Sequence, residues 1–452
     1  MRKEETKAKI FRYMKKENGI TLIALVITII VLLILAGVVL ATLTGQGNII
    51  GNAENAVGQY KNSVNSEQEL INGIDKLLAN YVNGDNGNND NPPVVEIPEV
   101  DANGLAIENT TIKPDENSNI QIVIPAGFAP AILATGTTQS LPGQNGSVAS
   151  IMPAEEWNNI TVEDINKGIV VVDNAITYDN GQASGTVPDF NEFVWVPIPE
   201  SSNFARTAWT TKYGFDANGN WSTTLSTPHQ LAEVSTSYRW WEDKTTTEYT
   251  NMIASVQQHK GFYIGRYEAS KDSTGTIAQS KRNQEAWTSV TQTASITASA
   301  QLNPNNNSHL IYGIEWDSVL NWLNGNATIS SSTAGQTRTM ELDDIQTNST
   351  SWGNYLNSTG NAETGKGSQQ KTGYSEYWKA NNIYDLAGNV SEWTQERYST
   401  GTYRTLRAGY CYDTGDKYPV ASRGNEDEST TGNIYAIGYR FPFQLICCTD
   451  FW

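Results

Sequence analysis

Hydrophobic and polar positions divide this chain sharply near its N-terminus. Ile20–Leu43 contains no charged side chain over 24 residues. As a helix that rises about 1.5 Å per residue, it would reach roughly 36 Å, which is enough to cross a hydrocarbon core. The preceding Met1–Gly19 carries seven Lys and Arg against three Glu, and a basic flank stays cytoplasmic. The pattern predicts a single-pass anchor in the cell membrane, with the following residues outside the cell.

The apolar run is followed by a seam of hydrophobic side chains spaced mainly three or four residues apart. The seam consists of Val57, Tyr60, Val64, Ile71, Ile74, Leu78 and Tyr81. Such spacing is typical of a heptad-like stalk helix. Gly51, Gly58 and Gly73 each weaken a helix by about 1 kcal/mol relative to Ala, which favours a supported helix over a free rod. The stalk either packs on its own chain or self-associates with neighbouring copies.

A linker follows the stalk. Asn83–Asn91 has no hydrophobic side chain and precedes Pro92 and Pro93, a composition that cannot build a core. We therefore expect five parts: a basic leader at 1–19, the hydrophobic helix and stalk at 20–82, the linker at 83–103, a β-rich accessory segment at 104–185 and a C-terminal domain at 186–452.

Short β-type runs bounded by turn residues dominate the rest of the chain. The clearest are Ile120–Pro125, Gly168–Val172, Glu192–Pro197 and Gly261–Glu268. Helical periodicity is scarce after residue 105, although 13 Trp, 21 Tyr and 10 Phe supply enough apolar area for a large core. The sequence predicts an α+β class, with a long N-terminal helix followed by a loop-rich exterior.

Charge and cysteine content exclude several functions. The net charge is −18 and no basic stripe is present, so nucleic acid is not an expected partner. Cys411, Cys447 and Cys448 do not form the even, spread-out set of a disulfide framework, although a bond from Cys411 to one of the others stays open. The three His are too far apart for a zinc motif.

The junction between the basic leader and the apolar run resembles the type IV prepilin signature. Gly19 is followed by Ile20-Thr-Leu-Ile. The resemblance implies that a prepilin peptidase cleaves after Gly19 and methylates Ile20. The family's usual Glu at the fifth mature position is Ala24 here, which favours cleavage over polymerisation into filaments. A plain membrane anchor and a cleavable secretory signal are the alternatives.

Four later stretches resemble the formylglycine-generating enzyme (sulfatase-modifying factor) family, which has a C-type-lectin-like fold. They are Glu192–Pro197, Gly261–Glu268, Asn382–Trp393, and Arg407-Ala-Gly409 leading to Ile437–Arg440. The third stretch is the most specific, since it matches the family's pattern Tyr-Asp-x-x-Gly-Asn-Val-x-Glu-Trp. The resemblance spans roughly residues 186–445 and implies a core amphipathic helix at His309–Trp322.

Individual residues acquire expected roles from this resemblance. Trp195, Tyr263, Tyr384 and Trp393 are expected to be core aromatics. Arg407, Arg423 and Arg440 are expected to be scaffold beneath a loop surface. Oxygen ligands suit hard cations, and the family often places calcium near the positions of Asn389 and Glu392.

Catalysis is not expected. The catalytic members need two close thiolates for copper(I), whereas the matching region holds only Cys411. No copper is therefore expected, and formylglycine generation is the least favoured function.

The remaining candidate chemistry is recognition. Tyr410–Tyr435 is rich in Tyr and small polar residues, a composition that suits binding surfaces, and it resembles the variable region of proteins diversified by retroelements. The expected contact residues are Tyr410, Tyr412, Asp413, Asp416, Tyr418 and Tyr435. The sequence thus favours a cell-surface binding protein of lectin-like or adhesin-like type, whose ligand is a glycan, a protein or a phage component. A structural minor pilin is the alternative.

Overall fold

The computed structural model of the chain describes residues 97–134, 146–174, 190–209, 240–302, 307–333, 336–359, 365–398, 401–431 and 437–445, with short strand pairs inside 178–183 and 214–230. These residues belong to one compact unit that begins at Val95. The leader, the apolar run and the stalk lie outside the described residues. No helix within the described ranges is long and apolar enough to span a membrane.

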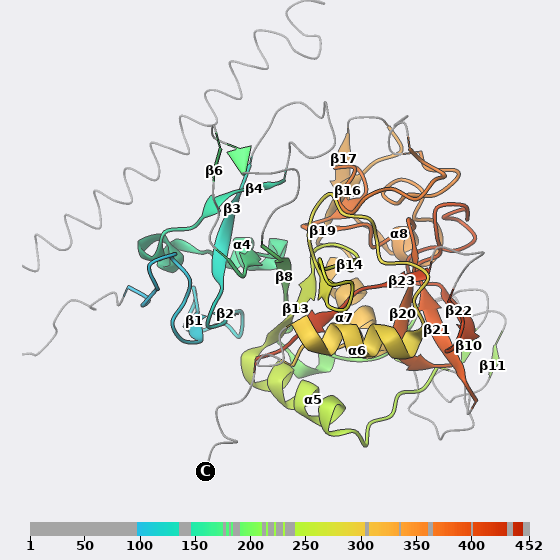
Figure 1. Ribbon diagram of the computed structural model, residues 1–452, viewed down its shortest axis with the longest axis horizontal. Helices are drawn as coiled ribbons and strands as arrows, with labels where there is room; N and C mark the ends of the chain where they lie inside the picture. The colour runs from blue at the N-terminus through green and yellow to red at the C-terminus, as the bar shows by residue number, and fades with distance from the viewer. Residues whose placement is uncertain are drawn as a thin grey trace, which may run out of the picture. The chain divides into compact units, whose positions relative to one another are not determined.

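A six-stranded antiparallel sheet organises the unit (Figure 1). Its order is β24 (Pro442–Phe443), β13 (Gly261–Gly265), β8 (Glu192–Pro197), β5 (Val170–Val172), β3 (Ala129–Leu133) and β4 (Val148–Ile151). Strands from the accessory segment thus pair directly with strands of the C-terminal domain. The boundary expected at residues 185–186 does not separate two sheets.

Both faces of this sheet are buried because its central strands are apolar at nearly every position. Val194 and Val196 enter one hydrophobic core, whereas Phe193 and Trp195 enter the other. Successive side chains of a strand point to opposite faces, so a continuous apolar run suits a strand covered on both sides. This explains why Glu192–Pro197 was predictable as a strand with its observed limits.

A second sheet has four strands, in the order β22 (Arg423–Asp427), β21 (Tyr403–Arg407), β20 (Ser391–Arg397) and β23 (Ile437–Tyr439). Only β20 and β23 run parallel in it; the other neighbours are antiparallel. The chain then passes from β23 directly into β24 of the large sheet. Residues 437–443 therefore join the two sheets, with Arg440 at the crossing.

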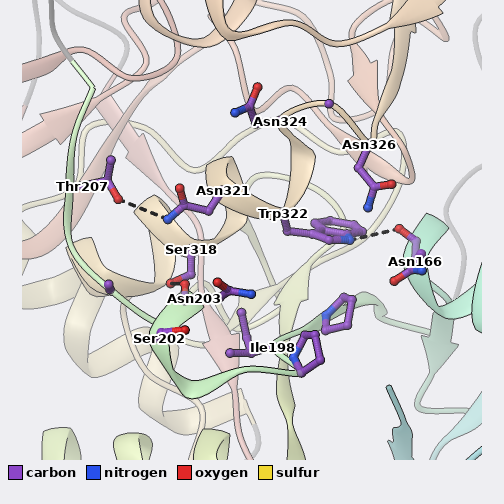
Figure 2. Close-up of a pocket in the computed structure, with 14 residues that line it drawn as sticks. Asn166, Ile198, Ser202, Asn203, Thr207, Ser318, Asn321, Trp322, Asn324 and Asn326 are labelled. Carbon is purple, nitrogen blue, oxygen red and sulfur yellow. Dashed lines mark hydrogen bonds between the residues drawn. The ribbon is translucent and has the colours of Figure 1, made fainter. Parts of the chain in front are cut away.

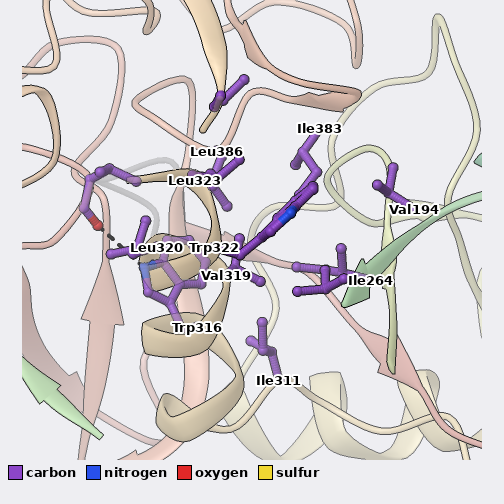
Figure 3. Packing of buried hydrophobic residues seen from close by; sticks show 14 of the residues in the cluster. Val194, Ile264, Ile311, Trp316, Val319, Leu320, Trp322, Leu323, Ile383 and Leu386 are labelled. Atoms are coloured by element: carbon purple, nitrogen blue, oxygen red, sulfur yellow. Dashed lines mark hydrogen bonds between the residues drawn. The ribbon is translucent and has the colours of Figure 1, made fainter. Parts of the chain in front are cut away.

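Helix α7 (Gly313–Leu323) forms the middle of one core (Figure 3). Trp316, Val319 and Leu320 are buried there, and the indole N–H of Trp316 donates to the carbonyl oxygen of Val420 at 3.3 Å. The helix expected at His309–Trp322 therefore exists but begins at Gly313. Glu315 caps its first turn by accepting the Tyr312 N–H at 2.9 Å, as in a capping box.

Two further long helices, α5 (Thr247–His259) and α6 (Gln292–Leu302), were not predicted. Helix α6 is made mostly of Ala, Ser, Thr and Gln and has little amphipathic pattern, so sequence periodicity does not reveal it. The short helices are η1 (Ala154–Asn159), α4 (Val162–Lys167), η2 (Ser201–Asn203) and α8 (Leu342–Gln346).

The remaining strands form two-stranded pairs. They are β1 (Thr110–Ile112) with β2 (Ile122–Ile124), β6 (Tyr178–Asp179) with β7 (Gln182–Ala183), β9 (Thr207–Ala208) with β12 (His229–Gln230), β10 (Gly214–Phe215) with β11 (Trp221–Ser222), β14 (Ser270–Lys271) with β15 (Ala278–Gln279), β16 (Thr328–Ser330) with β17 (Thr337–Thr339), and β18 (Lys379–Ala380) with β19 (Ile383–Tyr384). The four expected core aromatics, Trp195, Tyr263, Tyr384 and Trp393, are all fully buried.

Candidate functional site

The loop between β19 and β20 has a backbone that few residues can adopt. Asp385, Gly388 and Asn389 all have positive φ angles, of 54°, 76° and 60°. A Cβ on Gly388 would lie 2.2 Å from the carbonyl oxygen of Asn354, so this position requires glycine. Asn is among the few non-glycine residues that tolerate the left-handed region. The Gly-Asn pair is therefore explained by backbone geometry.

This loop leads into a buried polar group, the Glu268 cluster, which consists of Glu268, Asp385, Asn389, Glu392 and Arg440. The side-chain amide of Asn389 donates to Glu268 at 2.5 Å, and Glu268 also accepts the Val390 N–H at 3.1 Å. Arg440 pairs with Glu392 at 3.1 Å and donates to the carbonyl oxygens of Gly265 and Tyr384 at 2.9 Å each. Arg440 thus holds the crossing between the two sheets.

Three carboxyl groups share one arginine in the Glu268 cluster, and this raises their pKa values. Burial, the charge of Asp385 and the charge of Glu392 raise the pKa of Glu268 well above its ordinary value. Burial is also the main reason that the pKa of Asp385 is raised to about 7. Removing water from a carboxylate disfavours its charged form, which explains the direction of these shifts.

The calcium site expected at Asn389 and Glu392 does not fit this arrangement. The Asn389 side-chain oxygen already accepts hydrogen bonds from Asn354 at 3.0 Å and from the Gln370 N–H at 2.9 Å. Glu392 faces the Arg440 guanidinium, which repels a cation. In the part of the chain that the structure describes, no group of three or more His, Cys, Asp or Glu could hold a metal ion. Asn389 instead holds the loop between β19 and β20, and Glu392 pairs with Arg440 at the crossing between the two sheets.

A second buried polar group, the Asp317 network, lies between α7 and the small sheet. It contains Arg206, Glu242, Asp317, Glu396, Arg407 and Arg423, and all six side chains are at most 6 % exposed. Arg407 reaches Asp317 at 2.9 Å and Glu396 at 3.2 Å. Arg423 reaches the same two carboxylates at 2.6 and 2.9 Å. Three guanidinium groups therefore balance three carboxylates.

Two carboxylates of the Asp317 network have pKa values that are shifted in opposite directions. Burial alone would raise the pKa of Glu396, but Arg206, Arg423 and Arg407 together lower it to about 2. Glu242 lies at the edge of the network, where burial outweighs the attraction of Arg206 and raises its pKa to about 7. Glu396 is therefore the central anion that holds the three arginines.

The loop 408–422, between β21 and β22, is fastened near both of its ends to residues 349–355. The Tyr355 hydroxyl donates to the Ala408 carbonyl oxygen at 2.7 Å, and the Val420 N–H donates to Ser349 Oγ at 3.0 Å. Between these ends the chain turns outward, and Tyr412 is 60 % exposed. Ala408 has a positive φ of 75° at the place where the resembled family has glycine.

A groove of about 260 Å³ opens between this loop and the strands of the small sheet. We call it the recognition groove. Its lining residues are Ser391, Leu406, Gly409, Tyr410, Asp413, Tyr418, Ser422, Gly424, Asn425 and Glu426. Tyr410, Asp413 and Tyr418, which the sequence singled out, are thus brought together. Ser422, Asn425 and Glu426 were not singled out; their place within the polar stretch Tyr410–Tyr435 is the signal that could have found them.

The other expected contact residues lie outside the groove. The exposed Tyr412 ring packs edge-on against Tyr410, with centroids 5.8 Å apart. Asp416 is exposed and accepts a hydrogen bond from Asn357 at 2.8 Å. Tyr435 lies outside the described residues, as do the leader residues Gly19 and Ile20.

Cys411 points away from this surface. It is fully buried as a free thiol, and burial together with the charge of Glu268 raises its pKa to about 11. A thiol needs thiolate character to react or to bind a soft metal. Cys411 is therefore a packing residue in this arrangement. Cys447 and Cys448 lie outside the described residues.

Comparison with known proteins yields a distant structural likeness. Neither a protein-family model nor a curated protein sequence matches this chain. Among solved structures it is similar to PvdO from Pseudomonas aeruginosa, with 15% sequence identity and a TM-score of 0.33. The alignment covers 58% of this chain and 98% of PvdO.

Proposed function

We propose that this chain is a non-catalytic ligand-binding protein, anchored in the cell membrane by its N-terminal helix, that binds an extracellular partner through the recognition groove. The observation that carries the proposal is the contrast within residues 407–423. Arg407 and Arg423 are tied into the buried Asp317 network, whereas Tyr410, Asp413 and Tyr418 line an open groove between them. A rigid base beneath variable side chains is typical of binding loops.

The chemistry of the groove suits recognition of a polar partner. Tyr410 and Tyr418 offer aromatic area with few rotatable bonds, and Tyr412 adds an exposed ring beside them. Asp413 and Glu426 make the lining acidic, so a partner with hydroxyl, amide or cationic groups is favoured. The ligand class remains a glycan, a protein or a phage component.

Two features support the absence of catalysis. Cys411 is buried beneath the groove, with a raised pKa, so it does not offer a thiolate. It also lacks a second thiol nearby among the described residues, and copper(I) in thiolate sites needs two. The groove itself carries only tyrosine, serine, amide and carboxyl groups.

We further infer a C-type-lectin-like fold of the formylglycine-generating-enzyme type. The four motif stretches support it because they meet around one structural crossing. Glu192–Pro197 and Gly261–Gly265 pair with each other, and Gly261–Gly265 also pairs with β24. Ser391–Arg397 pairs with Tyr403–Arg407 and with Ile437–Tyr439.

If this chain is diversified by a retroelement, an adenine-rich near-copy of the 3′ coding end should lie beside a reverse transcriptase gene.

Alanine variants of the groove test the proposal. Full-length protein in detergent micelles would be measured against whole bacterial cells and a glycan array. Tyr410→Ala, Tyr412→Ala and Tyr418→Ala should weaken binding while the melting temperature stays close to that of the parent, since aromatic anchors commonly contribute about 1–4 kcal/mol to binding. The proposal fails if all three variants bind like the parent.

A further inference from the structure

A second and larger cavity is separate from the recognition groove, since the two share no lining residue. It measures about 620 Å³, within the range of small-molecule sites, roughly 300–1,000 Å³. The segment after β8, the C-terminal half of α7 and the turn after α7 form its walls (Figure 2). Figure 2 also shows Asn166 of α4 at one side.

One wall of this cavity is apolar and rigid. Pro197, Ile198 and Pro199 line it, and two prolines leave that backbone little freedom. Trp322 faces the same space, and its indole N–H donates to the Asn166 carbonyl oxygen at 3.0 Å. The ring is therefore held in place and keeps an apolar edge toward the cavity.

The opposite wall is a set of side-chain amides. Asn321 donates to Thr207 Oγ1 at 3.2 Å, which orients its amide (Figure 2). Asn203, Asn324 and Asn326 are exposed at the rim. Their side-chain amides form no hydrogen bond with any other residue in the described parts of the chain. Each amide offers both a donor and an acceptor, so the rim can bind groups that do the same.

The absence of charge from the lining of this cavity narrows the class of ligand that it can bind. None of the residues that line the cavity carries a charge, although the chain as a whole has a net charge of −18. A charged ligand would lose hydration here without gaining a partner. A phosphate-bearing ligand is disfavoured because no Lys or Arg lines the wall.

We propose that this cavity binds a neutral oligosaccharide. Sugar hydroxyls donate and accept hydrogen bonds as the rim amides do, and the C–H faces of a sugar ring match the Trp322 and proline wall. A peptide is the less favoured occupant. Peptides usually add to a free strand edge, whereas the adjacent β8 lies between β13 and β5 and has no free edge.

The test uses the full-length protein in a detergent without sugar headgroups, because a glycoside detergent would compete. The probe is an array of neutral oligosaccharides printed beside sialylated and sulfated ones. We expect binding to neutral members only. In the Asn324→Ala/Asn326→Ala double variant, the apparent Kd for the bound member should rise by about tenfold or more, since each lost hydrogen bond contributes up to about a factor of ten. The melting temperature should not change, because both side chains are exposed.

Two matched variants separate this site from other effects. Asn117→Ala removes an exposed amide from the connection between β1 and β2 and should leave sugar binding unchanged. Tyr412→Ala removes an exposed ring beside the recognition groove; in that background the Asn324→Ala/Asn326→Ala change should raise the apparent Kd for the neutral member by the same factor, whether or not the function proposed above is correct. The inference is overturned if no neutral oligosaccharide binds, if charged members bind more tightly, or if the double variant binds like the parent.

Discussion

Arg407 of β21 and Asp317 of α7 form a fully buried ion pair, with Nη2 2.9 Å from Oδ1, although 90 residues separate them in the chain. Asp317 also accepts from Arg423 of β22 at 2.6 Å and from the Thr207 N–H at 3.0 Å. One carboxylate thus joins the core helix, the small sheet and the segment after β8. Thr207, which lines the larger cavity, is thus bound to the same carboxylate as Arg423.

The first prediction concerns that ion pair. Arg407→Ala should reduce the free energy of unfolding by about 3–5 kcal/mol, because it removes one of the three guanidinium groups that compensate the buried carboxylates of Asp317 and Glu396. Lys167→Ala is the matched control, since its partner Glu163 is exposed and such pairs contribute at most about 1 kcal/mol. Chemical denaturation measures both. If Arg407→Ala reduces the free energy of unfolding as little as Lys167→Ala does, a scaffold role for Arg407 is contradicted.

The second prediction is a pH dependence. Burial alone would lower the pKa of His309, but its pairing with Glu315 at 3.1 Å and the charge of Glu248 raise it to about 9. The unfolded value is about 6.5. The contribution of His309 to stability is therefore fully present below about pH 6.5 and is lost as the pH rises to about 9.

His309→Gln should flatten the decline in stability between pH 7 and about 9, which a series of denaturation curves would show. Glu242 and Asp385, with pKa values raised to about 7, add to the decline near pH 7, but they do so equally in the parent and in His309→Gln. His259→Gln is the control, because burial lowers the pKa of His259 and places its effect below pH 6.5. If the stability of His309→Gln declines between pH 7 and about 9 as it does in the parent, another group causes the decline.

The third prediction concerns calcium. Chelation should leave the melting temperature unchanged, because Asn389 and Glu392 already have protein partners. A native-state ligand at a hundredfold excess over its Kd would add about 2.7 kcal/mol, which a melting curve detects easily. A fall on chelation that Glu392→Gln removes would restore the calcium site expected from the resemblance.

The fourth prediction concerns the buried thiol. Cys411 should react with an alkylating reagent at pH 7 only after denaturation, because its pKa is raised to about 11 and its side chain is buried. Peptide mapping after labelling distinguishes it from Cys447 and Cys448. Rapid labelling of Cys411 in the native protein, or tight copper(I) binding lost in Cys411→Ser, would contradict a packing role.

The fifth prediction concerns the leader. Cleavage between Gly19 and Ile20 should produce a mature chain that begins Ile-Thr-Leu-Ile, since the basic leader ends where the uncharged run begins. Mass spectrometry of N-terminal peptides from native membranes measures this. An intact Met1 would remove the prepilin interpretation, and cleavage beyond Leu43 would also remove the anchor.

The local pattern of apolar and polar residues was sufficient to predict part of the fold. Glu192–Pro197 is apolar on both faces after its first residue, so it could only be a strand covered on both sides, and it forms β8 with those limits. The aromatic positions Trp195, Tyr263 and Trp393 were recognisable as core for the same reason. Helix α6 shows the limit of this approach, because packing rather than periodicity makes Gln292–Leu302 helical.

By itself, the sequence determined the chain's division into an uncharged run and an acidic remainder, the central strands and the absence of paired thiols around Cys411. These properties depend on residue type and near neighbours. Only the tertiary structure decided that Arg423 shares a carboxylate with Arg407, that the Asn389 side chain is hydrogen-bonded to Glu268, and that Asn203 and Asn324 line the same cavity. The physical reason is that ion pairs, hydrogen-bond saturation and cavities depend on distances between residues far apart in the chain, which no local pattern encodes.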